Sequence, residues 1–334
     1  MITDYNLQIL IEPLLNWFAG HARVLPWREE PTPYRVWVSE IMLQQTRVEA
    51  VKPYFERFTK RLPDVEALAE CPEDELLKLW EGLGYYNRVR NMQKAAVQVM
   101  EEYGGKLPAD YEKLLKLKGI GSYTAGAIAS IAYQIPVPAV DGNVFRILTR
   151  VSADTDIMKP SFRSLLEKEL REVMQGMEMP GAFNQALMEL GATVCVPNGA
   201  PLCEQCPWNR LCLARKEGRI AELPVRTKAK ARRIEKRTVL VIRDNDKVAI
   251  RKRPEKGLLA GLYELPNVEG RYSQDEIVHL VKEMQLSPIR VQKLENAKHI
   301  FSHIEWQMEG YAVLVEEAGF DTEAEKMAEN HLIF

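Results

Sequence analysis

The sequence has no apolar stretch long enough to cross a membrane and no excess of basic residues that would mark a nucleic-acid-binding protein. Its formal net charge is -2 over 334 residues, so a DNA-binding surface would require local clustering of basic side chains. The first residues lack the basic region and apolar run of a secretory signal, and we expect a cytoplasmic protein. In that compartment the five cysteines are not expected to form disulfides.

Internal repeats and low-complexity segments are also lacking, and the length favours about two domains. Residues 1–221 predict a helical domain, because apolar residues recur at intervals of three and four between Pro and Gly. The basic run over 222–237 predicts a linker. Residues 238–334 predict an α+β domain, with a hairpin that turns at Asp244–Asp246 and a helix over Ser273–Leu286.

Four of the five cysteines lie close together, and they are Cys195, Cys203, Cys206 and Cys212. Four thiolates at such spacing can bind one tetrahedral zinc ion or one iron–sulfur cluster. Zinc sites of four cysteines usually contain two Cys-x2-Cys pairs, whereas this sequence has one pair between two single cysteines. The spacing therefore favours a [4Fe-4S] cluster and leaves zinc open. Cys71 lies far away in the chain and is predicted to be a packed core residue.

The segment Leu117–Gly126 predicts two helices joined by a tight turn. Gly119 and Gly121 permit positive φ and let a backbone approach closely. The N–H groups that begin the second helix, at Ser122, have no partner within it and favour an anion such as a DNA phosphate. An ordinary helical hairpin explains this segment equally well when it is taken alone.

Glu40 is predicted to lie on a helix over Tyr34–Val51 that Thr32 caps and Pro53 stops. Its carboxyl falls at the edge of the apolar stripe, where partial desolvation would favour the protonated form that a general acid needs. A solvated glutamate paired with Arg47 explains the same position, and the pattern alone favours that simpler interpretation.

Asp141 directly precedes another helical run and is predicted to be its N-cap. Backbone N–H groups and the helix dipole would keep its carboxylate ionised. A protonated Glu40 together with an ionised Asp141 would form the acid–anion pair that breaks glycosidic bonds.

The glycine turn, the Asp-Gly-Asn that begins at Asp141 and the four-cysteine loop together resemble the helix-hairpin-helix DNA glycosylase superfamily. Within it, the segments Trp37–Val48, Gly82–Tyr86 and Phe301–His303 resemble the adenine DNA glycosylase (MutY) family, and the likeness covers essentially the whole chain. The sequence departs from the family in having seven residues, not six, between the first two cluster cysteines, and we expect a slightly larger loop.

The resemblance implies a mainly helical glycosylase core in two lobes, one carrying the hairpin and the other joining the N-terminal helix to the iron–sulfur loop. It also implies a C-terminal Nudix-like domain, which we expect to recognise rather than hydrolyse because the catalytic Nudix box is absent. The implied activity is release of adenine from A:8-oxoguanine or A:G mispairs in duplex DNA, by a monomer in the nucleoid. Glu40 would protonate the flipped adenine, and Asp141 would stabilise or capture the sugar cation.

The resemblance assigns further roles, and the supporting active-site residues are Tyr123, Asn143 and Arg28. Residues expected to contact DNA are Gln44, Gln45, Thr46, Tyr85, Gly119, Gly121 and Ser122, with Phe301, Ser302 and His303 sensing 8-oxoguanine. A surface salt bridge is the alternative for Arg28, and burial within its loop is the alternative for Tyr85. Tyr123 stands where strand-cleaving relatives have a lysine, so no lyase step is expected. Three rivals are a glycosylase with another base preference, a non-enzymatic DNA-binding module and a zinc-stabilised helical protein.

Overall fold

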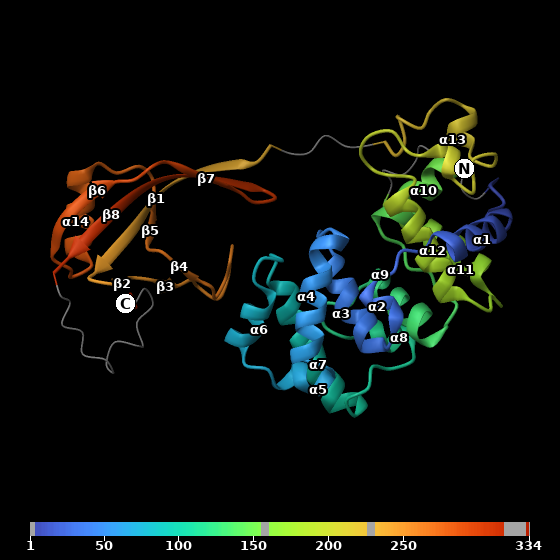
Figure 1. Cartoon of the computed structure of the whole chain (residues 1–334), viewed down its shortest axis with the longest axis horizontal. Coiled ribbons are helices and arrows are strands. Elements are labelled where there is room, and N and C mark those ends of the chain that lie inside the picture. Colours follow the sequence, from blue (N-terminus) through green and yellow to red (C-terminus); the bar gives the residue numbers. More distant parts are fainter. Residues whose placement is uncertain (1–3, 155–159, 226–230, 317–331, 334) are drawn as a thin grey trace. The chain divides into compact units, whose positions relative to one another are not determined.

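The computed structural model (Figure 1) divides the chain into two units, Met1–Arg226 and Thr227–Phe334. The residues that it describes are 4–154, 160–225, 231–316 and 332–333. Within those ranges the first unit is helical, whereas the second contains a sheet and the helix α14 (Gln274–Glu283). None of the described helices has the length and apolar character needed to cross a membrane.

Short turns join the helices of the first unit, and several helices begin at a side chain that accepts a backbone N–H bond. Such caps are Thr32, Asp64, Asp110 and Asp141. The helices are α1 (Ile11–His21), α2 (Pro26–Glu29), α3 (Pro33–Leu43), α4 (Val48–Arg61), α5 (Val65–Glu70), α6 (Glu73–Trp80), α7 (Asn87–Tyr103), α8 (Tyr111–Leu115), α9 (Ser122–Ala127), α10 (Gly142–Val151), α11 (Pro160–Met174), α12 (Pro180–Thr193) and α13 (Leu213–Lys216).

One apolar core joins the N-terminal helix to the cysteine region. Leu14 of α1 packs in this core with Ile147 of α10 and Leu187 of α12, and Trp208 of the cysteine loop belongs to it as well. The Trp208 indole N–H also donates to the carbonyl oxygen of Leu10 at 3.0 Å. Because apolar burial is the main force that holds helices together, this core fixes α10 and α12 beside the cysteine loop.

The prediction of a single helix over Tyr34–Val51 that stops at Pro53 is wrong. A turn at 44–47 separates α3 from α4, and Pro53 lies inside α4. Gln45 has a φ of 62°, which ends the helical path. The Arg88 side chain donates to two carbonyl oxygens near the end of α3, at 2.6 Å each. A residue distant in sequence thus satisfies acceptors that the helix end leaves unpaired.

The glycine turn lies between α8 and α9, and α9 continues into a π-helical segment, Ile128–Ala132. Gly119 has a φ of 78°, and a Cβ there would lie 2.8 Å from the Cβ of Asn91, so this position requires glycine. Gly121 does not use the positive φ that glycine permits, because its φ is -97°. A Cβ at Gly121 would meet no described atom within 4 Å, so neither packing nor backbone conformation demands glycine there.

The second unit is built on a sheet with the strand order β2-β1-β8-β6, in which β5 pairs with β1 and β7 pairs with β8. Strands β3 and β4 form a separate pair. The strands are β1 (Arg233–Asp244), β2 (Lys247–Val248), β3 (Arg251–Lys252), β4 (Tyr263–Glu264), β5 (Asn267–Glu269), β6 (Pro288–Lys293), β7 (Ala297–Ile300) and β8 (Ile304–Val315).

The hairpin predicted at Asp244–Asp246 is confirmed, because β1 and β2 pair antiparallel and Asn245 adopts a φ of 53°. The helix expected after it is also confirmed, as α14, with Ser273 and Glu276 forming a reciprocal capping box. Strand β1 begins at Arg233, so the end of the basic run belongs to the sheet. Residues 226–230 of that run lie outside the described residues.

The two faces of this sheet differ in chemistry. Leu240 and Ile242 of β1 lie opposite Tyr311 and Val313 of the parallel strand β8, and all four pack in an apolar core with α14. Side chains alternate between faces along a strand, so the register that pairs Glu235 with Trp306 places both on the other face. On that face Glu235, Arg237 and Trp306 lie near one end of the sheet, and Val239 and Val241 follow along β1.

Candidate active site and cysteine centre

Glu40 is buried in the helical unit, with 5% of its surface exposed. Its carboxylate accepts a hydrogen bond from the Tyr123 hydroxyl, which lies on α9. Burial raises the pKa of Glu40 to about 7; the nearby charge of Asp141 also raises it, while the Tyr123 hydrogen bond and the Arg28 charge lower it. The simpler interpretation of a solvated glutamate is therefore wrong, and the carboxyl can hold a proton near neutral pH.

Tyr123 joins the glycine hairpin to α3 through that hydrogen bond. Its hydroxyl also lies 3.7 Å from the Met188 sulfur. Burial raises the pKa of Tyr123 well above its ordinary value, and the charges of Glu40 and Asp141 add to the rise. Tyr123 is thus a neutral donor whose state does not change across physiological pH.

Asp141 caps α10 as predicted, because its Oδ1 accepts the backbone N–H of Val144 at 2.7 Å. Its Oδ2 accepts from the side-chain amide of Asn143, also at 2.7 Å. Burial raises the pKa of Asp141, and these hydrogen bonds and the charge of Arg146 oppose that rise. The expectation that capping alone would set its ionisation is corrected, because the residue is also desolvated.

Arg146 holds the side chain of Asn143 in place through a hydrogen bond. Its guanidinium donates to the Asn143 Oδ1 at 2.8 Å, to the Gly191 carbonyl at 2.7 Å and to the Cys195 carbonyl at 2.8 Å. A Cβ at Gly191 would lie 2.5 Å from the Cβ of Asn143, so α10 and α12 approach this closely because residue 191 is glycine. Hydrogen bonds thus connect the cysteine loop with the amide that holds Asp141.

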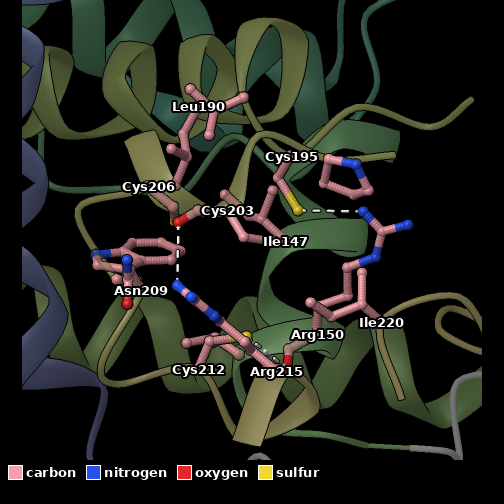
Figure 2. Close-up of a pocket in the computed structure, with 14 residues that line it drawn as sticks. Ile147, Arg150, Leu190, Cys195, Cys203, Cys206, Asn209, Cys212, Arg215 and Ile220 are labelled. Carbon is pink, nitrogen blue, oxygen red and sulfur yellow. Dashed lines mark hydrogen bonds between the residues drawn. The ribbon is translucent and has the colours of Figure 1, made fainter. Parts of the chain in front are cut away.

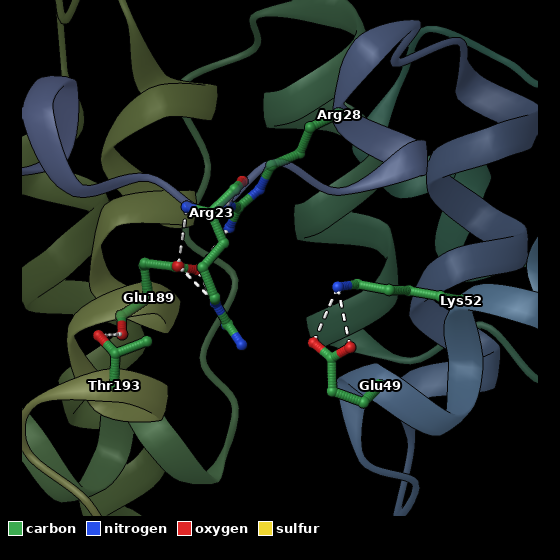
Figure 3. Close-up of polar contacts among 6 residues, drawn as sticks. All are labelled: Arg23, Arg28, Glu49, Lys52, Glu189 and Thr193. Carbon is green, nitrogen blue, oxygen red and sulfur yellow. Dashed lines mark hydrogen bonds and ion pairs between the residues drawn. The ribbon is translucent and has the colours of Figure 1, made fainter.

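Sequence reasoning missed Glu189 of α12, whose side chain is 1% exposed (Figure 3). It accepts from Arg28 at 2.8 Å and from Arg23 at 2.6 and 3.0 Å. Burial by itself would raise the pKa of Glu189, but the hydrogen bonds and charges of the two arginines outweigh burial and lower it. In the sequence, the feature that could have identified Glu189 as functional is that it is the single acidic residue within the apolar run of α12. The alternative of a surface salt bridge for Arg28 is therefore wrong, because its partner Glu189 is buried, and Arg28 also acts electrostatically on Glu40.

The residues expected to enter the duplex occupy two strained turns. Gln45 (φ 62°) is exposed between α3 and α4, and Tyr85 (φ 47°) is 51% exposed before α7, so burial of Tyr85 within its loop is excluded. Arg88 connects the turns, because its Nη2 donates to the Gly84 carbonyl at 3.2 Å and its guanidinium lies 5.7 Å from the Tyr85 ring. Gln44 and Thr46 flank Gln45 and are half-buried.

The four clustered cysteines line one cavity, together with Ile147, Leu190 and Trp208 (Figure 2). Arg150 donates to the Cys195 sulfur at 3.2 Å, and Arg215 also lines the cavity. Burial raises the pKa of the Cys206 thiol to about 12.

The described residues contain no group of three or more His, Cys, Asp or Glu placed to hold one metal ion. The four cysteines nevertheless line one shared cavity, and four thiolates are the donor set of either one zinc ion or one iron–sulfur cluster. Cys71 is buried away from this cavity, as predicted.

Phe301, Ser302 and His303 form the turn between β7 and β8 in the second unit. Ser302 and His303 are exposed, whereas the Phe301 ring is half-buried and lies 5.1 Å from the Trp306 ring. In the glycine turn, the Ser122 hydroxyl donates to Glu167 at 3.2 Å.

Family models match both units. Residues 38–174 match the model described as HhH-GPD superfamily base excision DNA repair protein, and residues 238–331 match that of the NUDIX domain. The chain is 37% identical to the adenine DNA glycosylase of Mus musculus, over 92% of this chain and 71% of that protein. It is 34% identical to the adenine DNA glycosylase of Buchnera aphidicola, over 89% of this chain and 85% of that protein.

Solved structures share the helical fold. A thermostable thymine-DNA glycosylase matches with a TM-score of 0.58 and 26% identity, over 63% of this chain and 96% of that protein. Endonuclease III in a non-covalent DNA complex matches with a TM-score of 0.54 and 23% identity, over 65% of this chain and 98% of that protein. The matched part corresponds in length to the helical unit, so the sheet unit is an addition to this fold.

Proposed function

The chain belongs to the adenine DNA glycosylases of base excision repair, and we propose that it releases adenine paired with 8-oxoguanine or guanine in duplex DNA. The observation that carries the chemistry is the burial of Glu40 with Tyr123 and near Asp141, which raises the pKa of Glu40 to about 7. An acid with that pKa keeps a proton to donate at neutral pH.

In the proposed reaction, the target adenine leaves the duplex and enters the site of Glu40. Glu40 transfers its proton to N7 of adenine. The bond between the base and C1′ of the sugar then breaks, its electron pair goes to the base, and an oxocarbenium ion remains. The ionised Asp141 stabilises this cation or bonds to C1′, in the manner of the second carboxylate of glycosidases. Water attacks C1′ and gives its proton to Glu40, which restores both carboxyl groups.

Asn143 and Arg28 serve this reaction by position and charge. Asn143 orients Asp141 through the 2.7 Å hydrogen bond. Arg28 limits the rise in the pKa of Glu40, so the acid releases its proton readily. Tyr123 provides a hydroxyl and no amine, so no Schiff base can form there, and we propose that the enzyme does not cleave the strand.

We further propose that Cys195, Cys203, Cys206 and Cys212 hold a [4Fe-4S] cluster. Bound there, the cluster would stabilise the loop that begins at Cys195 and act as a local charge, with no part in bond breaking. The observation that supports it is the shared cavity that the four thiols line. A brown preparation with visible absorption that bleaches on chelation or oxidation would distinguish it from zinc.

DNA binding is proposed at three segments of the helical unit. The turn with Gly119, Gly121 and Ser122 would approach a phosphate, and the turns of Gln44–Thr46 and Tyr85 would enter the duplex. In the sheet unit, Phe301–His303 would recognise 8-oxoguanine. We propose that the enzyme acts as a monomer on cytoplasmic nucleoid DNA, with salt-sensitive affinity.

The direct test is single-turnover base release from duplexes with adenine opposite 8-oxoguanine, guanine, cytosine or thymine. Release from the first two duplexes, with strand breaks appearing only after alkali or heat, is the expected result. Equal release from all four duplexes would overturn the proposed pairing preference. Strand breaks that form without treatment as fast as adenine appears would overturn the proposed absence of lyase chemistry.

A further inference from the structure

Trp306 lies on the face of the sheet opposite the α14 core, and charged side chains surround its indole ring. The indole is 8% exposed. Its ring lies 4.8 Å from the guanidinium carbon of Arg237 and 5.5 Å from that of Arg253. Its N–H donates to Glu235 at 2.9 Å. Cation–π attraction and this hydrogen bond together hold the ring in one orientation.

The two arginines are themselves held in place. Arg237 donates to Glu235 at 3.0 Å and to Asn267 at 3.1 Å. Arg253 pairs with Glu264 and also donates to the Leu258 carbonyl at 2.8 Å. These partners come from β1, β4, β5 and the loop before β4, so the groups around Trp306 link the main sheet to the separate β3–β4 pair.

Stability alone does not require this arrangement. Charged groups lose hydration when they are covered, and well-packed apolar side chains commonly stabilise a fold as much or more. The opposite face shows that alternative, with Leu240, Ile242 and Val313 under α14. A polar cover that fixes an aromatic ring at one orientation instead favours a role in positioning.

Trp306 contacts the turn that begins with Phe301. The Phe301 ring contacts Trp306 edge to face at 5.1 Å and His299 at 4.5 Å, and the turn is closed by the Phe301 N–H bond to Ile304 at 2.8 Å. The exposed residues Ser302 and His303 follow directly. Phe301 is half-buried against Trp306, so a change in this contact would move the segment from which the next two side chains project.

We propose that Trp306, clamped by Arg237 and Arg253, is a positioning residue that sets the preference for the base opposite adenine. The inference rests on the proposed function of Phe301–His303 and extends it to a residue that itself need not touch DNA. Ser302 and His303 can discriminate between guanine and 8-oxoguanine only when the turn is ordered before binding. If the turn became ordered on binding, the entropy it lost would offset the binding free energy that these two side chains contribute.

The test compares single-turnover base release from A:8-oxoguanine and A:G duplexes for Trp306→Leu, Trp306→Phe and wild-type full-length enzyme. The measured ratio is the half-saturating enzyme concentration for the A:G duplex divided by that for the A:8-oxoguanine duplex. Trp306→Leu is expected to lower this ratio about tenfold, because edge-to-face and cation–π contacts are lost together. Base release at saturation from A:G is expected to change less than about twofold. Trp306→Phe is expected to recover part of the ratio, since a phenyl ring keeps the contact with Phe301.

Val313→Ala is the matched control, because it weakens the same strand from the other face, inside the α14 core. It is expected to lower the unfolding temperature and to leave the ratio unchanged. If Trp306→Leu does not fold, Arg253→Gln decides, since it removes one cation from above the indole while Glu264 keeps its ion pair with Arg251. A ratio retained by that variant, or by a folded Trp306→Leu, would overturn the inference alone. An equal loss in Val313→Ala would do the same. A wild-type enzyme with no preference for 8-oxoguanine over guanine would overturn the proposed recognition role of Phe301–His303 as well.

Discussion

The two candidate functional regions of this protein, the Glu40 site and the Phe301–His303 turn, are built in opposite ways. Glu40 is buried on α3 and Asp141 is half-buried at the N-cap of α10, and each bonds to a fixed neighbour, whereas Ser302 and His303 are exposed at a hairpin turn. Chemistry on a neutral base needs a carboxyl with a raised pKa, which burial chiefly provides here, with the charge of Asp141 adding to it. Recognition of a base edge needs exposed hydrogen-bond donors and acceptors. The residues packed beneath the turn must therefore hold these exposed side chains in place.

The largest effect on base release is expected when residue 40 can no longer donate a proton, because the buried site then loses its acid. Glu40→Gln is expected to lower single-turnover base release about 1000-fold, within the usual range for loss of a general acid. The same substitution is expected to stabilise the protein at pH 8. The pKa of Glu40 rises from an ordinary 4.5 to about 7 on folding, so the ionised form disfavours folding by up to about 3 kcal/mol.

The sign of that effect follows from proton binding. The folded state holds the proton more tightly, so the destabilisation is absent below pH 4.5, grows between 4.5 and about 7, and is constant above. Glu49→Gln is the control, since Glu49 is 76% exposed and pairs with Lys52 on the surface (Figure 3). Thermal unfolding at pH 4 and pH 8 checks the prediction, and a less stable Glu40→Gln at pH 8 would contradict it.

Loss of the Arg146 hydrogen bonds, which hold Asn143 against Asp141, is expected to have the next largest effect. Arg146→Met removes the donors to Asn143, Gly191 and Cys195 and should lower base release about 100-fold through misplacement of the acid–anion pair. Affinity for uncleaved duplex should change far less. Arg61→Met, at a residue that pairs with Glu75 on the surface, is the matched control. A variant that loses DNA affinity and retains its rate would contradict the prediction.

Tyr123→Phe sharpens the comparison by testing how the buried site tunes its acid. Wild-type single-turnover rates should fall as pH rises through about 7, as Glu40 loses its proton. The Tyr123 hydrogen bond lowers the pKa of Glu40, so its removal should shift this alkaline limb to higher pH. The rate below the limb should fall about tenfold, as expected for one hydrogen bond to a charged group. A shift toward lower pH is the result that would refute this account.

The smallest effect is expected in the exposed turn. Ser302→Ala should weaken binding to A:8-oxoguanine two- to tenfold, about the value of one hydrogen bond, and leave A:G binding unchanged. Fluorescence anisotropy with uncleavable substrate analogues measures both affinities. An equal loss on both duplexes would indicate a phosphate contact in place of base recognition.

The helical pattern, the caps and the glycine turn were predictable because they depend on local backbone preferences. Asp141 as an N-cap, the hairpin at Asp244–Asp246 and the capping box at Ser273 are examples. The break between α3 and α4 was not predictable, because Arg88, far along the chain, supplies the donors that end α3. Glu189 and Trp306 were missed for the same reason, since their partners come from distant segments.

The sequence by itself determined which side chains have the chemistry for the site: two acids in suitable local settings, four clustered cysteines and a turn rich in glycine. Only the tertiary structure decided their state, for a carboxyl takes its pKa from the solvent it loses and the groups that surround it. Glu40 is an acid with a pKa of about 7 because the packed helices bury it and Asp141 lies near, and these two effects outweigh the opposing hydrogen bond from Tyr123 of α9.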